Sequence, residues 1–198
     1  MCPRSESQFE AIRERRRKAI LDTALRLFAQ KGFAETTTED IAGGVGISKG
    51  LIYNYFSSKQ EIVERLITES FRDALPTLMG NGTTPDPGQQ LEELVHQWIA
   101  LIRSSPDLLR LVLQLHTSSA FRKLVQRRAG DILETFHAGI ILIFRRMGSR
   151  EPELDARLLG SLFDGISLNY AARPGVFPLD QMEGRLIALY RSRKALNQ

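Results

Sequence analysis

Residues 36–59 read TTTEDIAGGVGISKGLIYNYFSSK, and this stretch decides the fold of the first part of the chain. Three threonines can cap a short helix, and Thr36 with Glu39 has the spacing of a capping box. Gly46 permits the left-handed backbone conformation that ends a helix, and Ser48 is a natural N-cap for a second short helix. Two short helices joined by a tight turn are the elements of a helix-turn-helix motif.

The charge pattern of this stretch suits a polyanionic partner. No carboxylate lies between Ile41 and Gln60, and the two charged residues there are Lys49 and Lys59. A surface that contacts phosphates needs such a uniform sign. Upstream, five of the six residues 13–18 are basic, which fits either a solvated helix face or an arm that faces phosphates. The net charge of the 198-residue chain is +4, which permits a nucleic-acid partner without requiring one.

The segment resembles the DNA-binding domain of the tetracycline-repressor (TetR) family. The matching features, in chain order, are Gly32-Phe33, Thr36-Thr37, Asp40-Ile41-Ala42, Gly46-Ile47-Ser48-Lys49-Gly50, Tyr53-x-Tyr55-Phe56 and Ser58-Lys59. The family usually has helix formers where this chain has Gly43 and Gly44, and alanine where it has Val45. Because a glycine costs about 1 kcal/mol in a helix interior, the first short helix is expected to be soft in the absence of DNA.

The resemblance implies which residues contact DNA, position by position. Asn54 is the candidate for a base-edge contact, because its amide can pair bidentately with adenine. Gly50 would let the backbone approach the groove closely. For Tyr55 and Lys59, expected to clamp phosphates, the alternatives are core packing and simple solvation. The expected DNA-contacting residues are Thr37, Thr38, Ser48, Lys49, Gly50, Tyr53, Asn54, Tyr55 and Lys59.

The remainder of the chain is predicted to be helical, since the apolar–polar alternation typical of strands does not occur in it. Helices are expected over residues 10–31, 59–79, 91–103, 108–117, 121–147, 152–172 and 179–195, with Gly130 as a candidate break. The turn-rich segment 80–88, GNGTTPDPG, is expected to be a loop.

The expected fold class is therefore all-α, with about nine helices in total, forming a three-helix headpiece joined to a helical bundle. The expected domains are an N-terminal helix-turn-helix DNA-binding domain, residues 1–58, and a C-terminal ligand-binding and dimerisation domain, residues 59–198.

Two of the expected C-terminal helices carry apolar faces too wide for one short bundle to cover. Leucines repeat every four residues after Pro152, and Gly160 and Gly165 would let another helix approach closely. An intrachain core is the simpler alternative. A two-fold four-helix interface between two copies is the favoured interpretation, and the family resemblance supports it. The expected dimer residues are Leu154, Leu158, Leu162, Ile166, Met182, Leu186, Leu189 and Tyr190.

The resemblance also implies a small-molecule effector bound in the C-terminal bundle. Large apolar side chains with a few polar ones among them suit a largely hydrophobic ligand, although ordinary core packing explains the same residues equally well. The candidate ligand-binding residues are Trp98, Leu101, Leu115, His116, Phe121, Phe136, His137, Ile140, Phe163 and Asn169.

Other functional classes find less support. Residues 46–50 match G-x-S-x-G, but a nucleophile elbow requires a preceding strand, so no enzyme is expected. The three histidines lack metal-ligand spacing, so no metal or cofactor is expected. Cys2 is the only cysteine, and neither a secretory h-region nor a bilayer-length apolar run is visible. A cytoplasmic location is the simplest expectation.

The sequence therefore predicts a homodimeric, sequence-specific DNA-binding regulator of transcription. By the habit of the family it is expected to be a repressor, released from a palindromic operator by a small, largely hydrophobic ligand. Two alternatives stay open: a regulator that needs its ligand as a co-repressor, and a ligand-binding or interaction module without specific DNA readout. The expected partners are operator DNA, the effector and a second copy of the chain, and no membrane.

Overall fold

The computed structural model describes residues 6–80, 84–116 and 119–196. Within them the chain forms helices and no strand, which confirms the all-α prediction. None of these helices is both long and apolar enough to cross a membrane. The helices are α1 (Glu6–Lys31), α2 (Thr38–Val45), α3 (Lys49–Tyr53), α4 (Lys59–Met79), α5 (Pro87–Ser104), α6 (Pro106–His116), α7 (Ser119–Arg146), α8 (Pro152–Ala172) and α9 (Leu179–Leu196).

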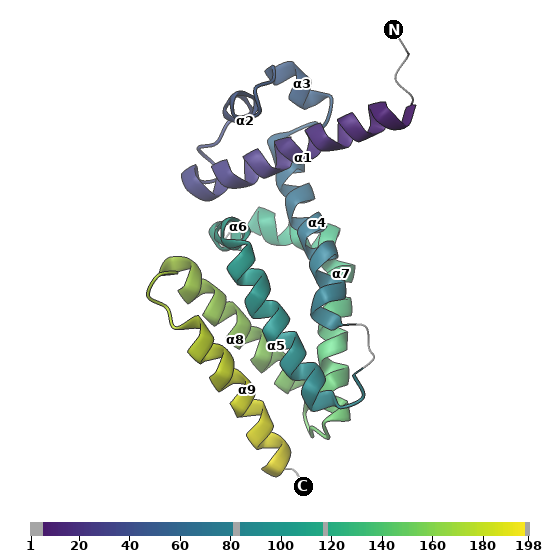
Figure 1. Cartoon of the computed structure of the whole chain (residues 1–198), viewed down its shortest axis with the longest axis vertical. Coiled ribbons are helices and arrows are strands. Elements are labelled where there is room, and N and C mark those ends of the chain that lie inside the picture. The colour runs from purple at the N-terminus through teal and green to yellow at the C-terminus, as the bar shows by residue number, and fades with distance from the viewer. Residues whose placement is uncertain (1–5, 81–83, 117–118, 197–198) are drawn as a thin grey trace.

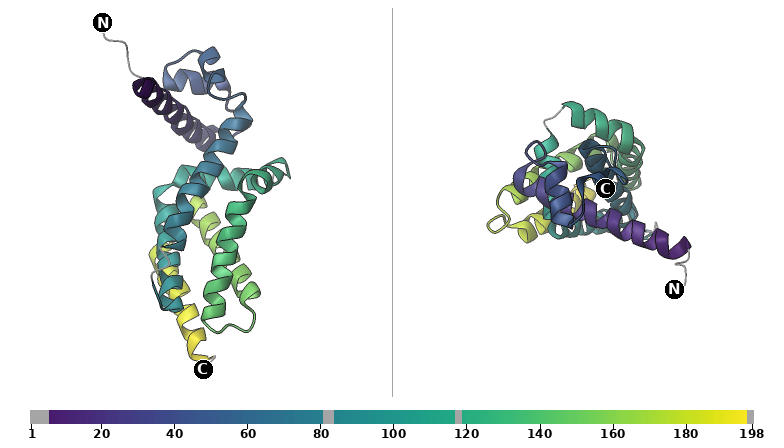
Figure 2. Two further views of the ribbon diagram at one scale, coloured as in Figure 1. Left: turned by 90° about the vertical axis from the view of Figure 1, so that its right-hand side faces the viewer. Right: turned by 90° about the horizontal axis from the view of Figure 1, so that it is seen from above.

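The helices form a small headpiece at one end of a longer bundle. In Figure 1, α1, α2 and α3 lie together at the top, and the bundle helices run towards the other end. Helix α4 begins in the headpiece and continues into the bundle, and α6 lies where the two parts meet. Seen from above, the first turns of α1 extend beyond the outline of the rest of the molecule (Figure 2, right).

Most of the predicted helix boundaries agree with the observed ones. Helices α4 and α8 span the predicted residues, whereas α1 begins at Glu6 rather than at residue 10. Helix α5 begins at Pro87 rather than at residue 91, because Asp86 caps it. The Asp86 carboxylate accepts a hydrogen bond from the N–H of Gly88 at 3.1 Å, and proline suits the first helical position. The predicted loop is therefore shorter than expected, and its residues 81–83 lie outside the described part.

Helix α7 is continuous through Gly130, so the candidate break does not occur there. Its axis nevertheless changes direction along its length, as the left view of Figure 2 shows. The longer second part packs closely against α4. A Cβ added at Gly139 would collide with the side chain of Met79, the last residue of α4. The end of the Met79 side chain therefore occupies the space beside Gly139 where other residues have a Cβ.

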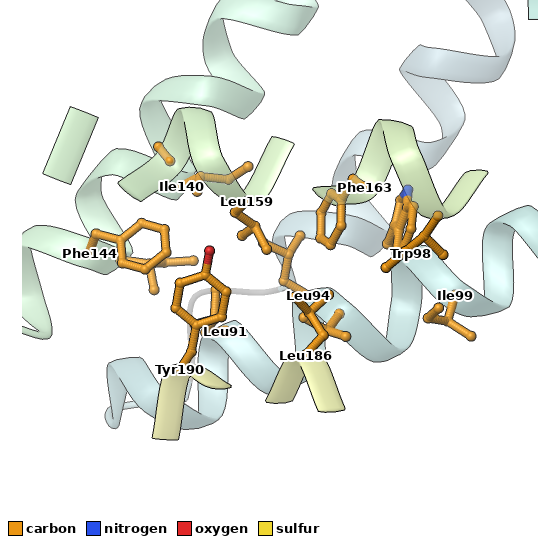
Figure 3. Close-up of a cluster of buried hydrophobic side chains, with 14 of the residues drawn as sticks. Leu91, Leu94, Trp98, Ile99, Ile140, Phe144, Leu159, Phe163, Leu186 and Tyr190 are labelled. Atoms are coloured by element: carbon orange, nitrogen blue, oxygen red, sulfur yellow. The ribbon is translucent and has the colours of Figure 1, made fainter. Parts of the chain in front are cut away.

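The core of the bundle contains a stacked pair of aromatic rings. Trp98 of α5 and Phe163 of α8 lie with their ring centroids 4.0 Å apart and their planes 13° apart. Such pairs bury a large apolar area in a defined geometry, which fixes α5 against α8. Other buried side chains in this core, drawn in Figure 3, are Leu91, Leu94, Ile99, Ile140, Phe144, Leu159, Leu186 and Tyr190.

A second core holds the headpiece together. Phe28 of α1, Ile41 of α2 and Ile52 of α3 are completely buried in it. The first half of α4 belongs to the same core through Ile62, Val63, Leu66 and Ile67. The helix-turn-helix is therefore fixed on α1 and α4 together.

Helix α6 connects the bundle to the headpiece core. Leu111 is completely buried in that core, and Leu108, Val112 and Leu115 pack around it. The Gln114 side chain also donates a hydrogen bond to a carbonyl near the end of α1. The headpiece core therefore includes residues of α4 and α6, which lie after residue 58. The expected division into a DNA-binding domain and a ligand-binding domain at residue 58 stays a prediction about the functions of the two parts.

The two glycines that depart from the family pattern have different surroundings. A Cβ added at Gly44 would lie 2.7 Å from Cγ2 of Thr23 on α1, so the glycine lets α2 lie close to α1. A Cβ added at Gly43 would meet nothing within 4 Å. Only Gly44 is therefore required by packing within the chain.

We predict that Gly43→Ala stabilises the protein by about 0.5–1 kcal/mol, because alanine favours the helix and restricts the unfolded chain. Gly44→Ala is expected to lose or reverse this gain, because its methyl group collides with a β-branched side chain of few rotamers. Urea unfolding of both variants beside the parent measures the difference. Equal stabilisation by the two substitutions would contradict the close packing at Gly44.

We expect Leu111→Ala to lower the free energy of unfolding by about 2–5 kcal/mol, the cost of a cavity in a packed core. Leu142→Ala is the matched control, since Leu142 is 56% exposed on α7, and its effect is expected within about 0.5 kcal/mol. Amide hydrogen exchange shows where the loss falls. Unchanged protection of α1–α3 in Leu111→Ala would contradict the place of Leu111 in the headpiece core.

Candidate nucleic-acid interface

Helix α2 is capped by Thr37, not by Thr36 as the capping-box spacing predicted. Thr37 Oγ1 accepts a hydrogen bond from the Asp40 N–H at 3.1 Å, and Asp40 Oδ2 accepts one from the Thr37 N–H at 2.9 Å. The Lys31 ammonium lies 3.2 Å from the other carboxylate oxygen. The backbone and side-chain hydrogen bonds of Thr37, followed by that of Lys31, lower the pKa of Asp40 to about 2. The Asp40 carboxylate is thus engaged within the headpiece.

Thr36 instead holds the turn between α1 and α2. It is completely buried, and its hydroxyl lies 2.8 Å from the Gly32 carbonyl oxygen and 3.3 Å from that of Leu27. The capping-box prediction was wrong because two pairs, Thr36 with Glu39 and Thr37 with Asp40, have the same three-residue spacing. Burial of Thr36 selects the second pair, and burial is not visible in the local spacing.

The turn between α2 and α3 is built as predicted. Gly46 has φ 76°, and the Ile47 N–H donates to the Ala42 carbonyl at 3.0 Å. Ser48 caps α3, its Oγ accepting from the Leu51 N–H at 3.3 Å. The G-x-S-x-G match therefore lies between two helices, and the strand that a nucleophile elbow requires is replaced by α2.

Helix α3 has a buried face and an exposed face. Ile52 on α3 and Phe56, which follows the helix, anchor it to the headpiece core, with exposed fractions of 0% and 2%. A Cβ added at Gly50 would meet nothing within 4 Å. Packing within the chain therefore does not require a glycine there, whereas close approach of another molecule would. The predicted groove-facing residues Lys49, Gly50, Tyr53 and Asn54 are all exposed.

The exposed face of α3 also receives a carboxylate from α2. The Lys49 ammonium donates a hydrogen bond to Oε1 of Glu39. This bond raises the pKa of Lys49 and lowers that of Glu39, so both groups are charged at neutral pH. The uniform charge of the stretch from Ile41 to Gln60 does not predict this pair, because Glu39 lies just before that stretch.

Two of the expected phosphate contacts are engaged inside the headpiece. Lys59 Nζ donates to the carbonyls of Phe33 (2.7 Å), Ala34 (3.2 Å) and Thr36 (2.7 Å), and it lies 4.5 Å from the Phe33 ring centroid. A phosphate would have to displace these carbonyls, so the expected clamp by the Lys59 ammonium does not fit the structure. Tyr55 is half-buried against the headpiece core, in line with its core-packing alternative.

A shallow hollow of about 330 Å³ lies where the N-terminal ends of α2 and α4 meet. Residues 36–39, Tyr53 and residues 57–60 line it. Ser58 caps α4, its Oγ accepting from the Glu61 N–H at 3.1 Å. Helix N-termini carry partial positive charge and backbone N–H donors, which favour a phosphate in the hollow, whereas the Glu39 carboxylate in its wall opposes one. Thr37 and Thr38, two of the predicted contacts, lie in its wall.

The expected ligand-binding residues fall into separate places. Trp98, Ile140 and Phe163 are buried in the bundle core, with Phe136 packed against it. Leu115 lies against the headpiece core instead. The sequence could not separate these positions, because a core residue and a ligand-lining residue have the same apolar character.

The other described members of that set do not add polar groups to a common site. Asn169 is exposed, and its amide donates to the Gly165 carbonyl of its own helix at 2.7 Å. Leu101 and His137 are half-buried, and the side chains of His116 and Phe121 lie outside the described part. Among the described residues, no three His, Cys, Asp or Glu side chains group as a metal site would require.

A second hollow, of about 320 Å³, lies between α5, the end of α7 and α9. Its walls include the apolar residues Leu91, Val95 and Ile187. At its edge, two hydrogen bonds from Arg191 hold the Glu92 carboxylate and lower its pKa. The volume is near the lower end of that of small-molecule sites. None of the eight expected ligand-binding residues whose side chains the structure describes lines it.

The expected dimer residues divide between interior and surface. The four-residue repeat of α8 advances by about 40° around the helix at each step, so it starts exposed at Leu154 and ends buried at Ile166. Leu186 and Tyr190 of α9 are buried as well. Ile166, Leu186 and Tyr190 therefore belong to the core within the chain, and their contact with a second copy stays a prediction. Leu162 and Met182 are half-buried, whereas Leu154, Leu158 and Leu189 are 58%, 44% and 48% exposed.

The headpiece matches a known protein family. The family model "Bacterial regulatory proteins, tetR family" matches residues 20–66, which include all of α2 and α3. The "Probable acrEF/envCD operon repressor" of Escherichia coli K12 is 32% identical over 101 residues, 48% of this chain and 46% of the repressor. The HTH-type transcriptional regulator BetI of Agrobacterium fabrum is 25% identical over 165 residues, 80% and 78% of the two chains. This chain thus spans about half the length of the first of these relatives.

Solved structures share the fold over nearly the whole chain. A transcriptional regulator from Pseudomonas aeruginosa PAO1 has a TM-score of 0.77 at 19% identity, covering 92% of this chain and 91% of its own. A regulator from Saccharomonospora viridis in complex with choline has a TM-score of 0.74 at 24% identity, covering 86% and 92%. Residues 20–66, which include the helix-turn-helix, therefore match the TetR family of bacterial regulatory proteins, and the chain as a whole shares the fold of these solved regulators.

Proposed function

We propose that the protein is a transcriptional regulator of the repressor type, which binds a specific duplex DNA site through α2 and α3. The observation that carries the proposal is the anchoring of α3: Ile52 on the helix and Phe56 just after it are buried in the headpiece core, whereas Lys49, Gly50 and Tyr53 of α3 are exposed. A helix held in this way can enter a major groove. The relatives that match the headpiece include named repressors. Such a regulator acts with its DNA in the cytoplasm.

Phosphate contacts would position α3 in the groove. At the starts of α2 and α3, the backbone N–H groups of Thr38 and Ser48 and the Ser48 hydroxyl suit phosphate oxygens. The Thr37 and Thr38 hydroxyls donate to Asp40 and Glu39 in the free protein, so they would have to turn to the phosphates. The basic run of α1 divides: Arg17 pairs with Glu69 of α4, whereas the other four basic residues are exposed. In Figure 2 the first turns of α1 reach outward, so cations there could follow the DNA backbone. Tyr53 and Asn54 would supply the contacts to base edges.

We propose that two copies associate through α8 and α9. On α8, Leu154, Leu158, Gly165 and Leu168 follow spacings of four, seven and three residues, which place them near one face, and three of these residues are exposed leucines. On α9, Gly184, Ala188 and Leu189 are exposed. Small residues beside leucines allow two helices to pack closely. A two-fold dimer would present two α3 helices to successive major grooves.

For the effector, we propose only a chemical class. We propose a small, largely hydrophobic ligand bound in the bundle, which favours a conformation that does not bind DNA. A ligand that instead favours the DNA-binding conformation would make the protein a co-repressor-dependent regulator. One structural neighbour contains choline. In this chain the hollow beside Glu92 and Arg191 has the size for a small ligand, whereas Trp98 and Phe163 fill the bundle core by stacking on each other.

Substitutions on α3 test the DNA-binding proposal. Lys49→Ala is expected to weaken binding to the selected operator and to reduce the slope of log K against log salt there by about 0.9, because one phosphate contact is lost. Asn54→Ala is expected to relax preference at one base pair, by about 1–3 kcal/mol, with little change in slope. Fluorescence anisotropy on a selected duplex and its single-base variants measures both quantities.

The control for Lys49→Ala is Lys123→Ala, which removes an exposed cation from α7. It is expected to leave affinity and salt slope nearly unchanged. If Asn54→Ala keeps the parent's preference at every base pair at matched salt, the assignment of base readout to Asn54 is wrong.

Leu158→Glu is expected to convert the dimer to monomers, because it places a carboxylate in the middle of the apolar face of α8. Its loss of operator affinity should follow, since a monomer has one α3. Leu142→Glu on α7 is the control, as Leu142 is similarly exposed. Sedimentation velocity at micromolar concentration reports the masses. If the Leu158→Glu protein stays dimeric, the proposal that α8 forms the dimer interface is wrong.

A further inference from the structure

Glu39 and Asp40 are neighbouring acids in α2 with different surroundings. Asp40 is engaged inside the headpiece by the Thr37 cap and Lys31. Glu39 extends across to α3, where its Oε1 accepts from Lys49. Its Oε2 accepts from the Thr38 hydroxyl at 3.1 Å. Two donors therefore hold the Glu39 carboxylate in place on the surface that carries Lys49 and Tyr53.

Three observations place this carboxylate where DNA would bind. The side chains of Glu39 and Lys49 are 59% and 48% exposed. Glu39 lines the hollow between the starts of α2 and α4, beside the threonines and Tyr53. Helices α2 and α3 lie at the end of the molecule remote from the bundle (Figure 1). A carboxylate on such a face is unusual, because phosphates repel it.

The pair with Lys49 changes the energetics of DNA binding. In the free protein, Glu39 neutralises Lys49 and so removes a cation that could attract any duplex. When Lys49 moves to a phosphate, Glu39 loses a donor while negative charges surround it. A carboxylate can only accept hydrogen bonds, so it needs a donor from the DNA itself.

The major groove offers such a donor at defined bases. Cytosine presents its N4 amino group there, and Glu or Asp accepting from it is an established pairing. Guanine presents the acceptors N7 and O6, which would repel a carboxylate, and thymine presents O4 and a methyl group. Adenine also presents an amino group, N6, but its N7 acceptor lies beside that group in the groove and disfavours a carboxylate there. The base opposite Glu39 therefore decides whether its charge is compensated or left unpaired.

We propose that Glu39 is a specificity-determining residue, which admits sites that place a cytosine amino group opposite the start of α2 and penalises other DNA. The inference rests on the proposed function, since it requires that α2 and α3 face the duplex. Its physical basis is selection by penalty: Lys49 supplies attraction to any phosphate, and Glu39 removes that gain wherever the base edge offers no donor.

The test uses Glu39→Gln in the full-length chain, which keeps the shape of the side chain and removes its charge. Affinity is measured for the selected operator and for a scrambled duplex of the same length, each at several salt concentrations. Glu39→Gln is expected to bind the scrambled duplex about tenfold more tightly, with a salt slope steeper by about 0.9. Its operator affinity should change less, so the ratio of the two affinities falls about tenfold.

Two matched variants separate this effect from simpler ones. Glu134→Gln makes the same change on an exposed side chain of α7, and it is expected to keep the parent's ratio within about twofold, because distant charge is screened. Glu39→Asp keeps the charge, and it is expected to keep the weak binding of scrambled DNA. Selection repeated with Glu39→Gln should lose the requirement for cytosine at one position of each half-site.

The outcomes distinguish this inference from the proposed function. If the parent prefers an operator and Glu39→Gln keeps both its ratio and its salt slope, the role of Glu39 is refuted while DNA recognition stands. If the parent enriches no site, the proposed function fails. In that case the role of Glu39 can still be tested on scrambled DNA. If Glu39→Gln binds scrambled DNA no more tightly than the parent does, the proposed penalty from the Glu39 carboxylate is refuted as well.

Discussion

Helix α4 is packed into both hydrophobic cores, and the relation between headpiece and bundle depends on this. Ile62, Val63, Leu66 and Ile67 are buried with α1, α2 and α3, while Leu78 packs against the bundle core. Its last residue lies on Gly139 of α7. Leu111 of α6 enters the headpiece core from the other side. A displacement of α5 to α9 therefore has two packed routes, through α4 and α6, by which it reaches the helix-turn-helix.

Polar groups fix the start of α4 to the turn before α2. The Lys59 ammonium bonds to three carbonyls of that turn, and the buried Thr36 hydroxyl bonds back to the end of α1. These contacts give α2 and α3 a definite position relative to α4. Preorganised elements of this kind reduce the ordering cost of binding. The exposed side chains of α3 are then free of structural roles in the headpiece core and can contact DNA. In the proposal, Lys49 of α3 attracts phosphates and Glu39 of α2 limits that attraction to suitable sites.

Local patterns predicted the elements well. Apolar periodicity gave α4 and α8 at their observed bounds, and Gly46 and Ser48 predicted the turn and the cap of α3. The failures concern choices that depend on burial or on contacts distant in sequence. Thr36 and Thr37 have equivalent spacings, so only the fold selects the cap. Lys59 looks like a surface cation until its distant carbonyl partners are known.

The same limit applies to the bundle. A four-residue repeat does not reveal which of its members turn inward, so Ile166 was grouped with Leu154 although one is buried and the other exposed. Aromatic residues suggested a ligand site, but Trp98 and Phe163 stack on each other. Glu39 was not among the expected contacts, because nothing in its sequence neighbourhood marks an acid that folds across to Lys49.

The most direct test of the account is selection of bound sequences from a random duplex pool, with the purified full-length chain at physiological salt. A dimeric helix-turn-helix reader predicts an enriched palindrome whose half-site centres lie about 10–10.5 base pairs apart, or a multiple of that distance. Strong, salt-sensitive retention of DNA without any enriched sequence, from a folded and dimeric protein, would contradict specific recognition by α2 and α3.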